Sequence, residues 1–126
     1  MASKQILIVD DEAIVRESIR DWLKDAGYQV LTAESGEEAL ALMEKHTFGV
    51  IILDLRLPGM TGIDVLKKVK SLKPNIKSIV TTAYPTMLTK DEASRLGVID
   101  YLIKPISPDK LEGLIRETLS KLEGRE

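Results

Sequence analysis

The stretch that decides the fold is Val50-Ile51-Ile52-Leu53-Asp54, four consecutive apolar residues followed by a carboxylate. A strand that is apolar on both faces is typical of the centre of a parallel sheet, where helices cover both sides. Other runs that predict strands also stop at polar residues: Ile6–Val9 at Asp10 and Asp11, Ser78–Thr81 at Thr82, and Tyr101–Ile103 at Lys104. Because ligands of open parallel sheets bind outside the carboxyl ends of the strands, these polar residues are the first candidates for a site.

Outward from this strand, segments with strand and helix patterns alternate along the chain, which indicates an α/β fold with a parallel sheet. The expected strands cover residues 5–9, 29–33, 50–53, 77–81 and 99–103. The expected helices cover residues 13–26, a segment opened by a capping-box pattern of Ser35 and Glu38, residues 63–72, residues 86–96, and a last segment capped by Ser107. The helix over residues 86–96 has few large apolar residues, so we expect it to be thinly packed.

The composition limits the class of protein. With 126 residues, 44% of them apolar and 30% charged, the chain is expected to form a single domain over residues 1–126, with residues 124–126 as a frayed end or the start of a linker. A net charge of −2 does not indicate direct binding of nucleic acid, which basic surfaces favour. The lack of cysteine excludes disulfides. Without a membrane-spanning run or a visible signal peptide, a cytoplasmic protein is expected.

Three carboxylates, those of Asp10, Asp11 and Asp54, are expected to meet at one edge of the sheet. At ~4 Å and an effective dielectric constant of ~20, each pair of such charges repels by about 4 kcal/mol. A cluster of this kind persists when a cation, an ammonium group or both offset the repulsion, and Lys104 follows a neighbouring strand. An all-oxygen site suits a hard divalent ion, so the sequence predicts Mg²⁺ as the cofactor.

The segments Val9–Glu12, Asp54–Gly62, Thr82–Ala83 and Tyr101–Pro105 together resemble the receiver (REC) domain of two-component response regulators, and the resemblance covers nearly the whole chain. The loop after Asp54 and the Ala83-Tyr84 turn resemble the nitrogen-regulator-like subfamily, whose members activate transcription with the alternative nitrogen-type sigma factor. The resemblance implies a doubly wound, flavodoxin-like (βα)5 three-layer sandwich with five parallel strands in the order 2-1-3-4-5. It also implies a cis peptide bond before Pro105.

The resemblance assigns a role to each acidic residue of the predicted site. Asp54 matches the residue that accepts the phosphoryl group. Asp11 and Asp54 would bind Mg²⁺ directly, together with the backbone carbonyl of Arg56, and Asp10 would bind it through a water molecule.

The resemblance also assigns roles to residues around these acids. Lys104 would pair with the phosphate, and the hydroxyl of Thr82 would form a hydrogen bond to it. Thr82 and Tyr101 would form the switch, with Tyr101 moving inward when Thr82 does. Arg56 and Tyr84 stand two residues after Asp54 and Thr82, and we expect their bulk to lengthen the lifetime of the phosphate.

The function implied is a phosphorylation-dependent signalling switch. A sensor histidine kinase or a phosphotransfer protein would supply the phosphoryl group. The face made by the fourth helix, the fifth strand and the fifth helix would then change, to control an output or to promote a homodimer. The domain itself would not contact nucleic acid or a membrane, and would catalyse only its own phosphorylation and slow autodephosphorylation.

Two alternatives remain open at this level. One is a Mg²⁺-dependent phosphohydrolase with an aspartate nucleophile, although haloacid dehalogenase-like enzymes have a second Asp where this chain has Arg56. The other is an interaction module that works without phosphorylation and keeps a relic pocket. Turnover of a phosphomonoester would favour the first, and failure to gain phosphate from a small donor would favour the second.

Overall fold

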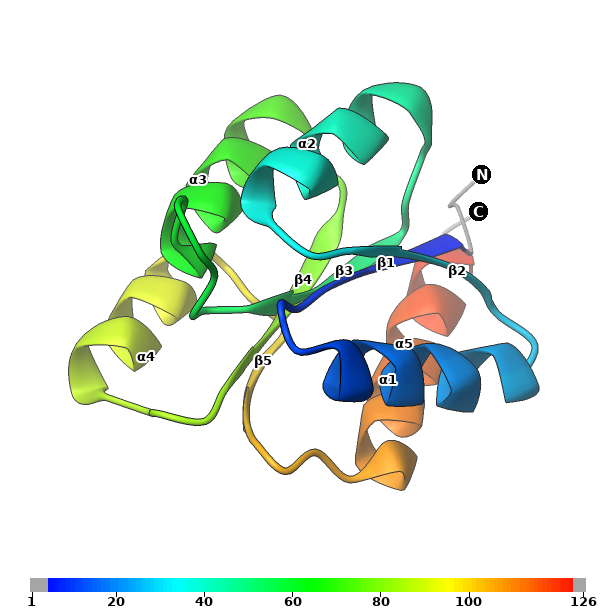
Figure 1. The fold of residues 1–126 in the computed structure, drawn as a ribbon. Coiled ribbons are helices and arrows are strands. Elements are labelled where there is room, and N and C mark those ends of the chain that lie inside the picture. Colours follow the sequence, from blue (N-terminus) through cyan, green and yellow to red (C-terminus); the bar gives the residue numbers. More distant parts are fainter. Residues whose placement is uncertain (1–4, 124–126) are drawn as a thin grey trace.

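Five parallel strands form the middle layer of the protein in the computed structural model, which describes residues 5–123 (Figure 1). The strands are β1 (Gln5–Val9), β2 (Gln29–Ala33), β3 (Val50–Asp54), β4 (Lys77–Thr82) and β5 (Asp100–Ile103). Their order in the sheet is β2-β1-β3-β4-β5. This confirms the predicted α/β fold and the 2-1-3-4-5 order that the resemblance implied.

Helices cover both faces of the sheet (Figure 1). They are α1 (Ala13–Asp25), α2 (Gly36–Lys45), α3 (Gly62–Leu72), α4 (Met87–Arg95) and α5 (Pro108–Glu123). Helices α1 and α5 lie on one face, and α2, α3 and α4 lie on the other. The expected frayed end or linker over residues 124–126 lies outside the described residues.

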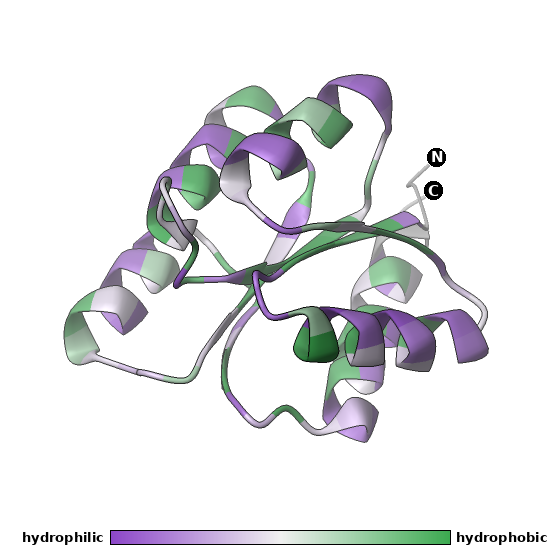
Figure 2. Cartoon of the chain, in the orientation of Figure 1, coloured by the Kyte–Doolittle hydropathy of each residue, from purple (hydrophilic) through white to green (hydrophobic). Residues whose placement is uncertain are grey.

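Side chains that alternate along each strand divide the interior into two hydrophobic cores, one on each face of the sheet. On β1, Leu7 and Val9 pack with residues of α2 and α3, whereas Ile6 and Ile8 pack with residues of α1 and α5. Every residue of β3 is buried, as the continuous apolar run predicted. Figure 2 shows that the central strands are mainly hydrophobic, whereas hydrophobic and hydrophilic residues are mixed along the helices.

The helix ends differ from the sequence predictions by a residue or so, because side-chain caps decide them. Helix α3 begins at Gly62 rather than residue 63, since the Thr61 hydroxyl accepts a hydrogen bond from the Asp64 amide at 3.2 Å. Ser35 caps α2 as expected, although the Glu38 carboxylate binds the amide of Glu34 rather than that of Ser35.

Helix α4 is the thinly packed element that the sequence indicated. Ala93 is its buried residue, and Met87 and Leu88 are 79% and 70% exposed.

The Lys104–Pro105 peptide bond, which directly follows β5, is cis, as the resemblance implied. Within residues 5–123, no helix combines the length and the apolar character that crossing a membrane requires.

Candidate functional site

Four strands deliver polar residues to one edge of the sheet. Asp10 follows β1, Asp54 ends β3, Thr82 ends β4 and Lys104 follows β5. The parallel register aligns these ends, since Asp54 stands beside Thr81 and Thr82 stands beside Ile103. The structure therefore brings the predicted residues to a common edge, as the rule for parallel sheets required.

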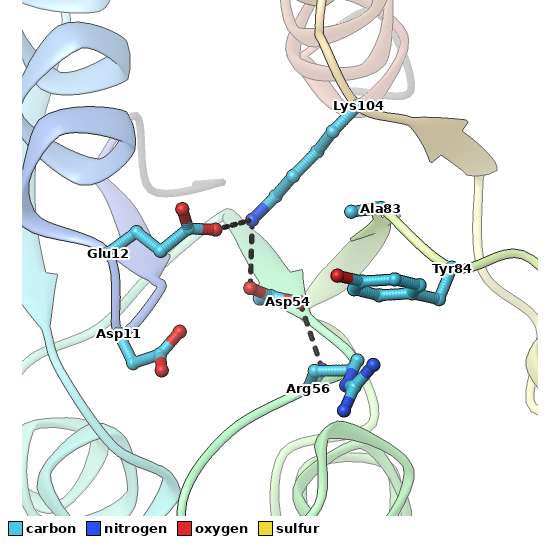
Figure 3. A pocket seen from close by; sticks show the side chains of 7 residues that line it. All are labelled: Asp11, Glu12, Asp54, Arg56, Ala83, Tyr84 and Lys104. Atoms are coloured by element: carbon cyan, nitrogen blue, oxygen red, sulfur yellow. Dashed lines mark hydrogen bonds and ion pairs between the residues drawn. The ribbon is translucent and has the colours of Figure 1, made fainter.

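The Lys104 ammonium reaches the acidic residues and lies between Glu12 and Asp54 in Figure 3. Its ammonium nitrogen Nζ is 2.9 Å from Asp10 Oδ2, 2.9 Å from Asp54 Oδ2 and 3.1 Å from Glu12 Oε1. Burial alone would lower the pKa of Lys104, but its hydrogen bonds and ion pairs with Asp10 and Asp54 hold this pKa well above the usual value. Lys104 is therefore a fixed positive charge inside the acidic cluster.

The two buried carboxylates are held in the same way. Asp10 Oδ1 accepts a hydrogen bond from the Glu12 amide at 2.8 Å, and Asp54 Oδ1 accepts one from the Arg56 amide at 2.9 Å. In both cases the second oxygen is left for Lys104. Burial raises the pKa of Asp10 and the charge of Asp54 raises it further, against the opposing effect of Lys104 and the Glu12 amide.

Two further carboxylates complete the cluster. Carboxylate oxygens of Asp10, Asp11, Glu12 and Asp54 all lie within 4.8 Å of one another. Asp11 is exposed, and within residues 5–123 no side chain or amide forms a hydrogen bond or ion pair with its carboxylate. Oxygen donors of this number fit a hard divalent cation, so the residues present can hold the predicted ion.

A cleft opens above these residues, and Figure 3 shows the side chains that line it: Asp11, Glu12, Asp54, Arg56, Ala83, Tyr84 and Lys104. Its floor is charged, and its rim carries two large side chains. The Arg56 guanidinium carbon lies 4.4 Å from the centroid of the Tyr84 ring, which is a cation–π stack. Ala83, which has a small side chain, lines the cleft beside Tyr84.

Thr82 and Tyr101 are not among the residues that line this cleft. Thr82 is buried, and its Oγ1 accepts a hydrogen bond from the Tyr84 amide at 3.0 Å. It lines a neighbouring groove with Arg56, Tyr84 and Thr89. The Tyr101 hydroxyl lies 2.8 Å from Thr89 Oγ1, so the half-buried ring is tied to α4.

Sequence reasoning assigned no role to three residues of this region. Glu12 follows Asp11 directly and stands at the N-cap of α1, where it forms no side-chain cap bond and binds Lys104 instead. Ala83 and Thr89 carry no chemical signal of their own. Their place beside Asp54 and Tyr101 depends on how the loop after β4 and helix α4 fold back onto the sheet.

Comparison with known proteins identifies the class that this fold and cleft define. The family described as the response regulator receiver domain matches residues 6–116, so the chain belongs to that family. The alginate biosynthesis transcriptional regulatory protein AlgB of Pseudomonas aeruginosa is 40% identical over 107 residues, which cover 85% of this chain and 24% of that protein. The transcriptional regulatory protein ZraR of Escherichia coli is 37% identical over 119 residues, covering 91% of this chain and 26% of that protein.

The solved structures agree. The CheY-like response regulator receiver domain protein from Methanospirillum hungatei superposes with a TM-score of 0.93 at 33% identity, covering 99% of this chain and all of that chain. The chain spans about a quarter of the length of the curated relatives named above. It is thus a phosphorylation-dependent switch domain of two-component systems, a regulatory unit rather than a typical enzyme. The relatives' names agree with the predicted likeness to receivers of transcriptional regulators.

Proposed function

We propose that the Asp54 carboxylate accepts a phosphoryl group from a phosphohistidine of a sensor histidine kinase or a phosphotransfer protein. An Asp54 oxygen forms a bond to phosphorus while the bond from phosphorus to the histidine nitrogen breaks, and the imidazole leaves. One observation supports this role best: at the end of buried β3, Asp54 faces the Lys104 ammonium at 2.9 Å within a cleft lined by further carboxylates.

The acidic cluster supports Mg²⁺ as the cofactor of this site. Asp11, Asp54 and the backbone carbonyl of Arg56 would bind the ion, and Asp10 would do so through a water molecule. When bound, Mg²⁺ would neutralise charge on the oxygens of the phosphoryl group. The ion would also offset the repulsion among the carboxylates, which a single Lys104 offsets only in part.

Lys104 and Thr82 would hold the transferred group. Before phosphorylation, three carboxylates share the Lys104 ammonium, and afterwards it would pair with a phosphoryl oxygen as a point charge. The Thr82 hydroxyl accepts a hydrogen bond from the Tyr84 amide. The hydroxyl proton of Thr82 therefore remains available for donation to a phosphoryl oxygen.

The switch would act through α4. Movement of Thr82 toward the phosphate would open space for Tyr101. When Tyr101 moves into this space, the hydrogen bond between the Tyr101 hydroxyl and Thr89 Oγ1 would break. Helix α4 has little buried surface to resist this change, as expected for a segment that has two arrangements. The face of α4, β5 and α5, which exposes Met87 and Ile103, would report the change.

The partners and setting follow from the family. Residues 1–126 would act as one receiver domain whose phosphorylated face controls an output region of a regulator or promotes a homodimer. This domain would not itself bind nucleic acid or a membrane, and it would work in the cytoplasm. Its chemistry would be confined to its own phosphorylation and slow autodephosphorylation.

Incubation with acetyl phosphate and Mg²⁺, followed by intact-mass measurement, tests the proposal. We expect one labile phosphoryl adduct on the wild type and none on Asp54→Asn, which keeps the shape of the side chain. Asp11→Asn should slow the reaction, whereas Asp21→Asn, a change of the same charge on the exposed side of α1, should not. An adduct on Asp54→Asn, or none on the wild type, would contradict the assignment.

A further inference from the structure

Arg16 is a largely buried arginine beside the acidic cluster. It lies in α1, its side chain is 12% exposed, and its Nη1 donates a hydrogen bond to the backbone carbonyl of Asp10 at 2.8 Å. This carbonyl belongs to the peptide group that joins Asp10 to Asp11. Arg16 therefore ties helix α1 to the peptide group between two residues proposed to hold the cation.

The ion pairs of Arg16 do not explain its burial. The carboxylate paired with it is that of Glu34, which lies 3.9 Å away and is 70% exposed. Such a long and solvated pair contributes little free energy. A desolvated guanidinium is costly unless other charges compensate it. The bond to the Asp10 carbonyl places the guanidinium beside the first residue of the acidic cluster.

Backbone contacts around Asp11 hold this residue. Its carboxylate has no hydrogen bond or ion pair with any of the described residues 5–123, so only the backbone around Asp11 restrains it. That backbone is fixed on one side by the Asp10 amide, which donates to the Ala33 carbonyl at 3.1 Å. On the other side it is held by two contacts, the bond from Arg16 to the Asp10 carbonyl and the bond from the Glu12 amide to Asp10 Oδ1, each 2.8 Å long.

We propose that Arg16 is a positioning residue that directs the Asp11 carboxylate toward the cation site. The inference rests on the proposed binding of Mg²⁺ at this cluster. Arg16 acts on the ion in two ways of opposite sign. Its positive charge repels Mg²⁺, and its hydrogen bond orders the ligands. Removal of Arg16 should therefore tighten Mg²⁺ binding if only the charge matters, and weaken it if positioning dominates.

Calorimetric titration of the unphosphorylated protein with Mg²⁺ separates these effects. Arg16→Met keeps an apolar stem at this largely buried position and removes both the charge and the donor. We expect its Kd for Mg²⁺ to rise about tenfold, as for other groups that orient metal ligands. Arg20→Ala is the matched control, because it removes the same charge one turn later on α1, where the side chain pairs with Asp21. Its Kd should stay within about twofold of the wild type.

A Kd that is unchanged or lower in folded Arg16→Met overturns the inference. If that variant does not fold, wild-type NMR decides: the side-chain N–H signal of Arg16 should shift on addition of Mg²⁺ and that of Arg20 should not. Equal responses of the two signals overturn the inference. A wild type that binds no Mg²⁺ contradicts the proposed function, and the inference with it. Equal Mg²⁺ binding by wild type and Arg16→Met contradicts the inference alone.

Discussion

The Arg56 guanidinium lies over the ring of Tyr84, with 4.4 Å between its carbon Cζ and the ring centroid. The two residues come from the loops after β3 and β4, and both line the cleft above Asp54 (Figure 3). The two stacked side chains thus form one side of the cleft together. Water that attacks a phosphoryl group on Asp54 would have to pass this pair or displace it.

We therefore predict that Arg56→Ala combined with Tyr84→Ala shortens the lifetime of the aspartyl phosphate severalfold. Each single substitution should give most of the effect, because residues in contact do not contribute additively. The measurement is the decay of the phosphorylated mass after the donor is removed. Lys67→Ala, a change on the neighbouring groove, is the control and should leave the half-life unchanged. A half-life that is the same in the wild type, the two single variants and the double variant would reject the shielding role.

The burial of Asp10 and Asp54 gives a second prediction, which concerns stability. Without Mg²⁺, Asp54→Asn should raise the free energy of unfolding by about 1 kcal/mol or more, because it removes a charge from a cluster with too few cations. Asparagine is preferable to alanine because it keeps an acceptor for the Arg56 amide. Denaturant unfolding measures the difference. Added Mg²⁺ should stabilise the wild type more than Asp54→Asn by mass action.

The advantage of Asp54→Asn should depend on pH. A carboxyl group whose pKa is raised by folding, as burial does for Asp10, stabilises the fold while it is protonated. That contribution is lost as the pH rises through the folded pKa. Repulsion between Asp10 and Asp54 therefore operates above this pKa and fades below it. The advantage should be largest near neutral pH and shrink in acid. An advantage that grows on acidification would contradict this account.

The sequence predicted the framework of the site because the framework depends on strand ends. The apolar run before Asp54 indicated a central strand, and parallel strands necessarily bring residues such as Asp10 and Lys104 to the same edge. The cis bond at Pro105 and the strand order came from the resemblance. They needed no knowledge of side-chain conformations.

The contacts that the sequence did not predict are those between side chains of different elements. The third carboxylate on Lys104 is that of Glu12, which as the N-cap residue could equally have bound its own helix. The Arg56–Tyr84 stack and the bond from Tyr101 to Thr89 join residues that have ordinary surface chemistry. Their meeting depends on side-chain conformations in the folded chain, which neither spacing nor periodicity specifies.

The hydroxyl–hydroxyl bond between Thr89 and Tyr101 gives a third prediction. Thr89→Val and Tyr101→Phe each remove one partner of this 2.8 Å bond and keep the shape of the side chain. Tyr101→Phe should loosen α4 by roughly 0.5–1.5 kcal/mol, the net contribution of one hydrogen bond. Thr89→Val should loosen it further, because Thr89 Oγ1 also lies 2.9 Å from Thr86 Oγ1 and donates to the Thr86 carbonyl at 3.2 Å. The double variant should add little to Thr89→Val, since both changes break the contact between Thr89 and Tyr101.

Amide hydrogen exchange in α4 measures this loosening. Thr118→Val is the matched control, because the Thr118 hydroxyl donates within α5 to the Leu114 carbonyl and leaves α4 untouched. Exchange in α4 that is equally slow in all variants would show that the bond does not hold this helix. Faster exchange in Thr89→Val alone would show that Tyr101 is not its working partner.

A last prediction compares two glycines that sit in helices. A Cβ placed on Gly62 would collide with the backbone of Asp54 and would lie 2.5 Å from the Leu55 Cα, whereas one placed on Gly113 would meet nothing closer than Arg116 Nη2 at 4.0 Å. Gly62→Ala should therefore cost about 1–3 kcal/mol of stability through overpacking. Gly113→Ala should gain up to about 1 kcal/mol through helix propensity.

The same pair separates a local effect on Asp54 from a general loss of stability. Because Gly62 packs on the backbone that carries the proposed nucleophile, Gly62→Ala should slow phosphorylation by acetyl phosphate even at temperatures where it is fully folded. Gly113→Ala should react like the wild type. Thermal unfolding and the rate of mass gain, measured on the same samples, test both parts. If Gly62→Ala were as stable and as reactive as the wild type, the loop after β3 would not hold Asp54 in place.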